Sequence, residues 1–406
     1  MKHDLITRLK QKLLPDVQFS KGFINYLTMN ACFSAGTAFS NMFVNIFLLR
    51  SQEDMHAVLV YNLLQYAMIP LGFYAAGRFG KKTGLNRQLR IGIILMNILY
   101  ISLIVLRENA AVYALPLGLI FGFSSGLYYM PNNILLMRVT DQSNLDTGLS
   151  ISSFIGNAIG IVVPLVSGFI VSRFIDITGY IIIFSISLGL FITAGLVNLR
   201  APSDKEEGKF QMISTIKLCM QDKKIVLLNI ADFLRGNREG AMGFLLSVLL
   251  YQAVKNEFLL GINSFTCATA SLLAFAYISK KVNSQNRTNV FVLACLPVLV
   301  ASFVLFWGLN AYTIFVFSII TAIANLMMNN ASTAVGYTYI YQNNTLGTRR
   351  TECVVYREFF INMGRSTSIA ALFFIAQTPV NTVLFIFTLY FLQIPAWFFL
   401  RKVKPE

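Results

Sequence analysis

The chain has 406 residues, of which 56% are hydrophobic and 13% charged. Soluble proteins carry about 25% charged residues, so this composition excludes an ordinary soluble protein and indicates a membrane protein. The net charge of +15 would suit a nucleic-acid partner if the basic residues formed one patch, but they are spread along the chain.

The basic residues follow a pattern typical of membrane topology. If the N-terminus is cytoplasmic, most Lys and Arg residues outside the apolar runs lie at cytoplasmic ends. The other side holds Arg50, Arg107, Arg173 and Lys255. This asymmetry predicts that both termini are cytoplasmic and that the chain binds no nucleic acid.

About twelve apolar runs are long enough to cross a bilayer, which takes ~20 residues of helix. They cover residues 22–49, 56–77, 88–106, 111–137, 148–172, 178–199, 225–254, 257–279, 289–308, 311–341, 352–377 and 380–400. Runs of this length exclude a membrane β-barrel. The sequence therefore predicts an all-α membrane protein with twelve transmembrane helices.

Two stretches lie outside these runs. Residues 1–21 place apolar side chains among Lys and Arg at helical spacing, which predicts an amphipathic segment on the inner leaflet. Residues 201–224 begin with Ala201-Pro202-Ser203 and form the one long linker. The linker divides the chain into an N-terminal six-helix bundle, 22–200, and a C-terminal one, 225–406.

The two halves look related. Lys81-Lys82 corresponds to Lys280-Lys281, and Asn132-Asn133 corresponds to Asn329-Asn330, each at an offset of about 200 residues. An even number of helices per half gives both halves the same topology. Such parallel repeats are typical of two-bundle transporters that work by alternating access.

The chain resembles the major facilitator superfamily along nearly its whole length. The loop after the second predicted helix is similar to the gating loop of that family, because it keeps Arg78, Gly80, Lys81 and Lys82. Gly77 stands where the family has an Asp that latches the two bundles. The resemblance therefore implies the same twelve-helix fold with a latch made differently.

The fifth predicted helix resembles the family's antiporter signature. It carries Gly156, Gly160, Pro164 and Gly168, although Val163 and Ser167 replace two of the family's glycines. The resemblance implies export, while close packing of helices through small residues explains the same pattern. The fourth helix lacks the Arg that proton-coupled exporters of the family often carry there.

Charged residues concentrate in two runs of the C-terminal half. Run 225–254 contains Asp232, Arg235, Arg238 and Glu239, and run 352–377 contains Arg357, Glu358, Asn362 and Arg365. Each charge at the bilayer centre costs about 2.5–3.5 kcal/mol on insertion scales, so the charges need partners, water or a substrate. The string from Tyr356 to Arg365 also resembles exporter-like transporters of Gram-positive bacteria.

Two interpretations of these charges remain open. In the structural one, Arg235 or Arg238 pairs with Glu358, and Arg365 pairs with Glu239. In the functional one, an acid carries the coupling proton while an Arg binds an anionic group. The candidates for proton coupling are Glu358 first, then Glu239 and Asp232; those for charge pairing or anion binding are Arg235, Arg238, Arg357 and Arg365.

Uncharged polar residues lie on several other predicted helices. We expect a substrate cavity to be lined by Asn30, Ser34, Thr37, Asn41, Tyr61, Gln65, Tyr128, Asn132, Asn325, Asn329 and Asn362. Amides and tyrosines orient a substrate while aromatic faces accept its apolar part. The alternative is hydrogen bonding between helices, worth about 0.6 kcal/mol for each bond.

The sequence contains no catalytic constellation, phosphate loop or metal-ligand spacing, so we expect neither an enzyme nor a bound metal or cofactor. We expect a monomeric, multi-pass transporter of a bacterial plasma membrane, driven by a proton gradient, that exports amphipathic or drug-like small molecules. Its partners would be that substrate and the membrane lipids. The alternatives are a flippase for lipids or lipid-linked glycans and an importer of organic anions.

Overall fold

The computed structural model describes residues 21–52, 54–139, 145–200, 210–278, 282, 285–343, 349–375 and 378–403. The predicted amphipathic segment lies outside the described residues except for Lys21, and residues 201–209 of the linker lie outside them as well. In the described part of the chain the regular elements are all helices.

The N-terminal half contains six long helices. They are α2 (Lys21–Gln52), α3 (Met55–Thr83), α4 (Leu85–Leu106), α5 (Ala114–Val139), α6 (Leu145–Ser172) and α7 (Thr178–Leu199), and the short 3-10 helix η1 (Arg107–Ala111) follows α4. Each helix covers one predicted run. The apolar length of each run was therefore sufficient to locate these six spans.

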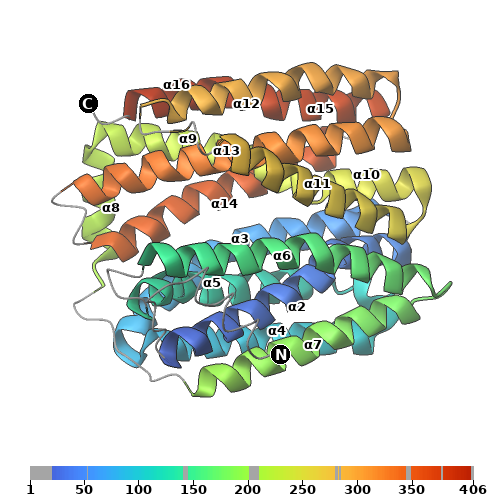
Figure 1. The fold of residues 1–406 in the computed structure, drawn as a ribbon, viewed down its shortest axis with the longest axis horizontal. Helices are drawn as coiled ribbons and strands as arrows, with labels where there is room; N and C mark the ends of the chain where they lie inside the picture. Colours follow the sequence, from blue (N-terminus) through green and yellow to red (C-terminus); the bar gives the residue numbers. More distant parts are fainter. Residues whose placement is uncertain are drawn as a thin grey trace, which may run out of the picture.

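The C-terminal half begins after the linker helix α8 (Met212–Gln221). Its elements are α9 (Lys223–Met242), α10 (Leu245–Val254), α11 (Glu257–Ile278), α12 (Arg287–Ser302), η3 (Phe303–Trp307), α13 (Ala311–Gln342), α14 (Arg350–Ile375), α15 (Pro379–Phe391) and α16 (Gln393–Val403). Figure 1 shows this half, in yellow to red, lying above the blue-green N-terminal half.

Two predicted spans are each divided between two helices. Run 225–254 is divided between α9 and α10, where Phe244 has φ −135° and leaves the helical region. Run 380–400 is divided between α15 and α16 at Leu392, which keeps helical dihedral angles, so Pro379–Val403 still forms one apolar span. Hydropathy detects an apolar run but does not detect a local change of backbone direction within it.

Nine helical segments of the described chain are long and apolar enough to cross a membrane. The other three predicted spans are α5, which is rich in polar residues, and the charged segments α9–α10 and α14. The arrangement in two bundles confirms the predicted all-α membrane fold. The cytoplasmic location of the termini stays a prediction.

The two halves meet along two pairs of helices, α3 with α14 and α6 with α11. On the second pair, a Cβ atom added to Gly168 would lie 3.1 Å from the Cα of Gly261, so the two backbones touch there. We call one end of the bundles the basic end. It is the end where α2 begins and where α3 ends at Lys81-Lys82-Thr83. The opposite end is the one where α2 finishes and α11 begins.

Candidate functional site

The charged helices α9 and α14 cross at very short range. Gly236 and Gly240 on α9 lie against the backbone of Ile361 and Arg365 on α14, and Gly364 lies against the carbonyl of Phe233. A Cβ atom at any of these glycines would clash with that backbone. The missing side chains therefore let the two helices approach until their charged groups share one site.

Asp232 and Arg357 form a buried ion pair between the two helices. Arg357 donates from Nε to Oδ2 of Asp232 at 2.7 Å and from Nη2 to Oδ1 at 3.1 Å. The guanidinium also lies 5.4 Å from the ring centroid of Tyr337 on α13. The sequence analysis placed both residues at the site but did not predict that they pair.

Glu239 lies among three arginines. Its carboxylate accepts hydrogen bonds from Arg235 and from Arg365, each at 2.6 Å, and Arg238 Nη2 is 3.7 Å away. The predicted pair of Arg365 with Glu239 is confirmed. Glu239 thus holds α9 to α14 through a charge-assisted bond.

Two of the arginines also reach α13. Arg235 donates to Thr333 Oγ1 at 2.9 Å. Arg238 is fully buried and donates to the Met328 sulfur at 3.1 Å and to the Asn329 side-chain oxygen. These bonds connect the charge cluster of α9 and α14 to the face of α13 that carries Met328, Asn329 and Thr333.

Glu358 differs from the other two acids. Among the described residues no Lys, Arg or His nitrogen forms an ion pair with it, so the predicted pair with Arg235 or Arg238 was wrong. Its carboxylate accepts from Asn362 Nδ2 at 3.1 Å. Asn362 in turn accepts from Arg365 at 3.1 Å. A chain of bonds therefore runs from Glu358 through Asn362 and Arg365 to Glu239.

The cluster also touches the N-terminal half. The Arg365 guanidinium lies 5.3 Å from the ring centroid of Tyr66 on α3, which is the range of a cation–π contact. Tyr66 lies beside Tyr61 and Gln65 in the polar stretch of α3 from which the sequence predicts cavity residues.

A cavity of about 670 Å³ lies between α6 of the N-terminal half and α11 and α13 of the C-terminal half. Its polar wall residues are Ser153, Asn157, Ser271 and Asn330, and the other lining residues are apolar or glycine. Ser153, Asn157 and Ser271 were missed by the sequence analysis. Asn157 directly follows Gly156, so the helix-five motif was the sequence signal that could have identified Asn157 as a cavity residue.

The glycines of the helix-five motif have two different roles. A Cβ atom added to Gly156 or Gly160 would meet nothing within 4 Å, and both glycines line the cavity. Gly168 instead packs on α11, where the carbonyl of Pro164 lies against Gly261. The structure therefore confirms close helix packing at the Gly168 end, whereas at Gly156 and Gly160 the missing side chains leave space.

The predicted polar residues of the N-terminal half mostly bond to their own bundle. Tyr128 donates to Asn30 at 3.1 Å, Thr37 donates to the Phe33 carbonyl, and the Asn132 carbonyl accepts from Tyr26. Asn330, next to the predicted Asn329 on the same polar stretch of α13, lines the α6–α11–α13 cavity, whereas Asn325, Asn329 and the other predicted cavity residues do not. Of the other predicted cavity residues, Tyr61 and Gln65 are buried, Ser34 is half-buried and Asn41 is exposed. Asn325 accepts a hydrogen bond from Tyr390 on α15.

Ion pairs join the two halves at both ends. At the basic end Lys81 lies 3.2 Å from Glu352, which also accepts from the Gln211 backbone N–H. At the opposite end Arg50 lies 3.3 Å from Glu257, which accepts from Tyr180 at 2.9 Å. The sequence analysis missed both glutamates.

Among the ion pairs of the described residues, one crosses between the halves from the predicted gating loop, and it is made by Lys81. Besides Lys81, the loop contains Arg78, which donates to the Tyr74 hydroxyl at 3.1 Å. Gly80 packs on Leu85, and Lys82 is exposed. Within the residues that the structure describes, no three His, Cys, Asp or Glu side chains gather as a metal site would require.

No protein-family model matches the chain. The chain is 29% identical over 364 residues to the uncharacterized protein YqgE of Bacillus subtilis (strain 168), covering 90% of this chain and 84% of that protein. It is 28% identical over 174 residues to an uncharacterized protein in the sodM 3′ region of Geobacillus stearothermophilus, covering 43% of this chain and 81% of that protein.

Solved structures resemble the whole fold. A bacterial homologue of the iron transporter ferroportin, in its inward-facing state, matches 95% of this chain and 99% of its own, with a TM-score of 0.71 and 12% identity. The E. coli fucose:proton symporter matches 95% of this chain and 98% of its own, with a TM-score of 0.66 and 11% identity. The chain therefore has the fold of major facilitator superfamily transporters, as its sequence predicted.

Proposed function

We propose that this protein is a secondary active transporter that exports an amphipathic small molecule by alternating access, driven by protons. The observation that carries the proposal is the position of the cavity. Its wall is built from both halves, so a rocking motion of one half against the other would reshape it. Its volume, about 670 Å³, lies within the range of ~300–1,000 Å³ that is usual for sites of small molecules.

The lining favours a substrate without net charge. Asn157 and Asn330 offer amide groups, Phe275 offers an aromatic face, and no charged residue is among the described lining residues. The arginines are engaged with Glu239, Asp232 and α13. An importer of organic anions is less well supported, because its anion would have to displace these partners.

Helix α13 supports coupling between the cavity and the charges. Asn330 lines the cavity, while its chain neighbour Asn329 accepts from Arg238 and Thr333 accepts from Arg235. Movement of α13 on substrate binding would therefore act on the arginines that hold Glu239. This is a direct physical link between two sites through one rigid element.

Glu358 is the proposed proton carrier. Protonation of Asp232 or Glu239 would break a buried ion pair, whereas within the described chain the Asn362 amide is the one hydrogen-bond donor to Glu358. The helix-five resemblance supports the outward direction of transport. The fucose:proton symporter, which has a similar fold, is named for proton coupling, and this supports the proton as the coupling ion. The bacterial plasma membrane is the proposed location, in keeping with the bacterial relatives.

The test is efflux of neutral amphipathic dyes from cells that express the protein, with and without a proton gradient. We expect efflux that collapses when a protonophore dissipates the gradient. The matched control is Glu358→Gln at equal expression in the membrane. Dye movement that is identical with and without the gradient would contradict proton coupling, and the absence of movement for every dye class would contradict export of amphipathic molecules.

A further inference from the structure

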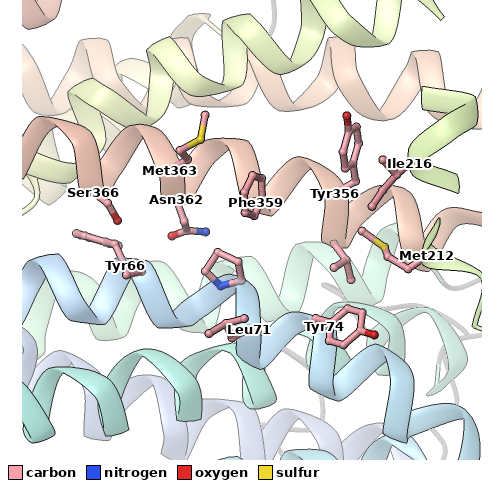
Figure 2. Close-up of a pocket in the computed structure, with 13 residues that line it drawn as sticks. Tyr66, Leu71, Tyr74, Met212, Ile216, Tyr356, Phe359, Asn362, Met363 and Ser366 are labelled. Atoms are coloured by element: carbon pink, nitrogen blue, oxygen red, sulfur yellow. The ribbon is translucent and has the colours of Figure 1, made fainter. Parts of the chain in front are cut away.

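A second hollow lies on the other pair of contacting helices. It is a groove of about 680 Å³ between α3, α8 and α14, and it shares no lining residue with the α6–α11–α13 cavity. Figure 2 shows the lining side chains of the three helices, with Asn362 and Ser366 pointing from α14 toward α3. Its wall is mostly apolar, with Pro70, Ile216 and Val355 among the lining residues.

The rim of this groove consists of exposed apolar side chains. Leu71, Phe359 and Met363 all line the groove and are exposed on the surface of membrane-spanning helices. An apolar rim on membrane-spanning helices is compatible with the hydrocarbon of the bilayer, because lipid tails are as apolar as these side chains. Lipid chains are therefore suitable molecules to fill the groove.

Basic residues lie where the groove reaches the basic end. Tyr74 lies at that end of the groove in Figure 2, and Arg78 donates to its hydroxyl at 3.1 Å. Lys217 on α8 is exposed and follows Ile216, which lines the groove. The same surface of α8 exposes Ile213, as expected of a helix lying at the membrane interface. Arg78 and Lys217 thus bring two basic side chains to the basic end of the groove.

We propose that this groove binds an anionic phospholipid, with one acyl chain between α3 and α14 and the phosphate at Arg78 and Lys217. From Tyr74 to Tyr66 the α3 wall extends ~12 Å at 1.5 Å per residue, which an acyl chain covers. An apolar chain fills the groove by van der Waals contact with its mostly apolar wall. The phosphate supplies the charge that the two basic side chains attract.

The site is not the substrate cavity of the proposed transporter, and lipid binding does not depend on transport. Its position still has a consequence for the charge cluster. Asn362 lines the groove and bonds to both Glu358 and Arg365. A bound chain therefore packs against the residue that joins the unpaired acid to the ion pairs.

The experiment is native mass spectrometry of the purified full-length protein, titrated with phosphatidylglycerol or with phosphatidylcholine of the same acyl chains. We expect one phosphatidylglycerol to be retained at concentrations where phosphatidylcholine is lost. A fatty acid and inorganic phosphate form separate arms, because each carries only half of the proposed ligand. Each should compete weakly with the intact lipid. Equal retention of the two phospholipids would overturn the role of Arg78 and Lys217.

Two variants separate the head-group contact from the chain contact. Arg78→Gln should weaken phosphatidylglycerol binding about fivefold, as expected for the loss of one basic residue near the membrane surface. The matched control is Arg87→Gln, which removes an exposed arginine of α4 at the same end. Phosphatidylglycerol binding unchanged in Arg78→Gln, or weakened equally in both variants, would overturn the assignment of the phosphate.

Ala67→Trp tests the chain, because Ala67 lines the groove and is exposed, so a large side chain fills the groove without entering the core. Ala67→Phe is the milder version if the Trp variant does not fold. Both should lose the retained lipid while the melting temperature of the delipidated protein stays the same. Full lipid retention in either folded variant would overturn the proposed site.

Discussion

At the scale of single residues, the three acids of the charged helices differ in what holds them. Asp232 is fixed by two bonds from Arg357, and Glu239 is fixed by Arg235 and Arg365. Glu358 accepts only from an amide. The two carboxylates with guanidinium partners stabilise the crossing of α9 and α14. Glu358 has no such partner among the described residues, so it can be protonated without breaking an ion pair.

Replacing Glu358 by Gln should therefore abolish proton-driven transport with little effect on stability. The amide keeps its shape and its bond to Asn362, so we expect a change of less than ~1 kcal/mol in the free energy of unfolding. Transport in vesicles with an imposed pH gradient is the measurement. Glu239→Gln is the contrasting variant, since it leaves three guanidinium groups without their carboxylate. Gradient-driven transport near the normal rate in Glu358→Gln would remove Glu358 from the mechanism.

For the ion pair of Asp232 with Arg357 we predict an effect on stability alone. Asp232→Asn should cost about 3–5 kcal/mol, because the Arg357 charge remains buried without its partner. Thermal unfolding of the purified variant measures this loss. Asp232→Leu combined with Arg357→Met should regain most of it by removing both charges. If the double variant is no more stable than Asp232→Asn, the unpaired charge of Arg357 is not the cause of the lost stability, and this prediction is wrong.

At the scale of elements, α6 uses the same residue type for two purposes. Gly156 borders open space in the cavity, whereas Gly168 lies against the backbone of α11. A sequence pattern of regularly spaced glycines does not distinguish these situations, because both need a small residue. Only the position of the neighbouring helix decides between them.

Leucine at the two glycines should therefore have opposite effects. Gly156→Leu should leave the melting temperature unchanged and prevent binding, since the side chain enters the cavity. Gly168→Leu should destabilise the protein by about 1–3 kcal/mol, since it forces α6 away from Gly261. Dye binding and thermal unfolding of both variants provide the comparison. Loss of stability in Gly156→Leu alone would contradict the cavity assignment.

Sequence reasoning worked where one run of residues carries the information. The length of the apolar runs located the spans, and the shared face of Glu358, Asn362 and Arg365 placed these residues in one site. It did not predict the pairing of Asp232 with Arg357, because that depends on how far α9 is displaced along α14. The polar wall of the cavity was missed for the same reason, since it comes from three helices distant in sequence.

At the scale of the whole molecule, the two halves are tied together at both ends. The pair of Lys81 with Glu352 joins α3 to α14 at the basic end, and the pair of Arg50 with Glu257 joins α2 to α11 at the opposite end. The proposed alternating access requires the two ends to open in turn, so under this proposal each pair would break in one of the states.

Removing one pair should shift the balance between those states. Glu352→Gln should favour opening at the basic end, and Glu257→Gln should favour opening at the opposite end. Distances between spin labels placed across each end measure the two populations. The exchanged pair, Lys81→Glu with Glu352→Lys, should restore the original distribution. Identical distance distributions in both single variants and the unmodified protein would show that the pairs do not act as gates.

The interruption between α9 and α10 has a consequence for water. The first amides of α10 lack the helical partners that an unbroken span would give them, and a membrane offers no solvent at that depth to replace those partners. The break lies one turn beyond Glu239, so hydration of these amides would bring water beside the ion-pair cluster. Hydrogen–deuterium exchange should then be faster at residues 245–247, the first of α10, than in the middle of α11 or α13. We therefore expect solvent to enter the protein interior at this break between α9 and α10.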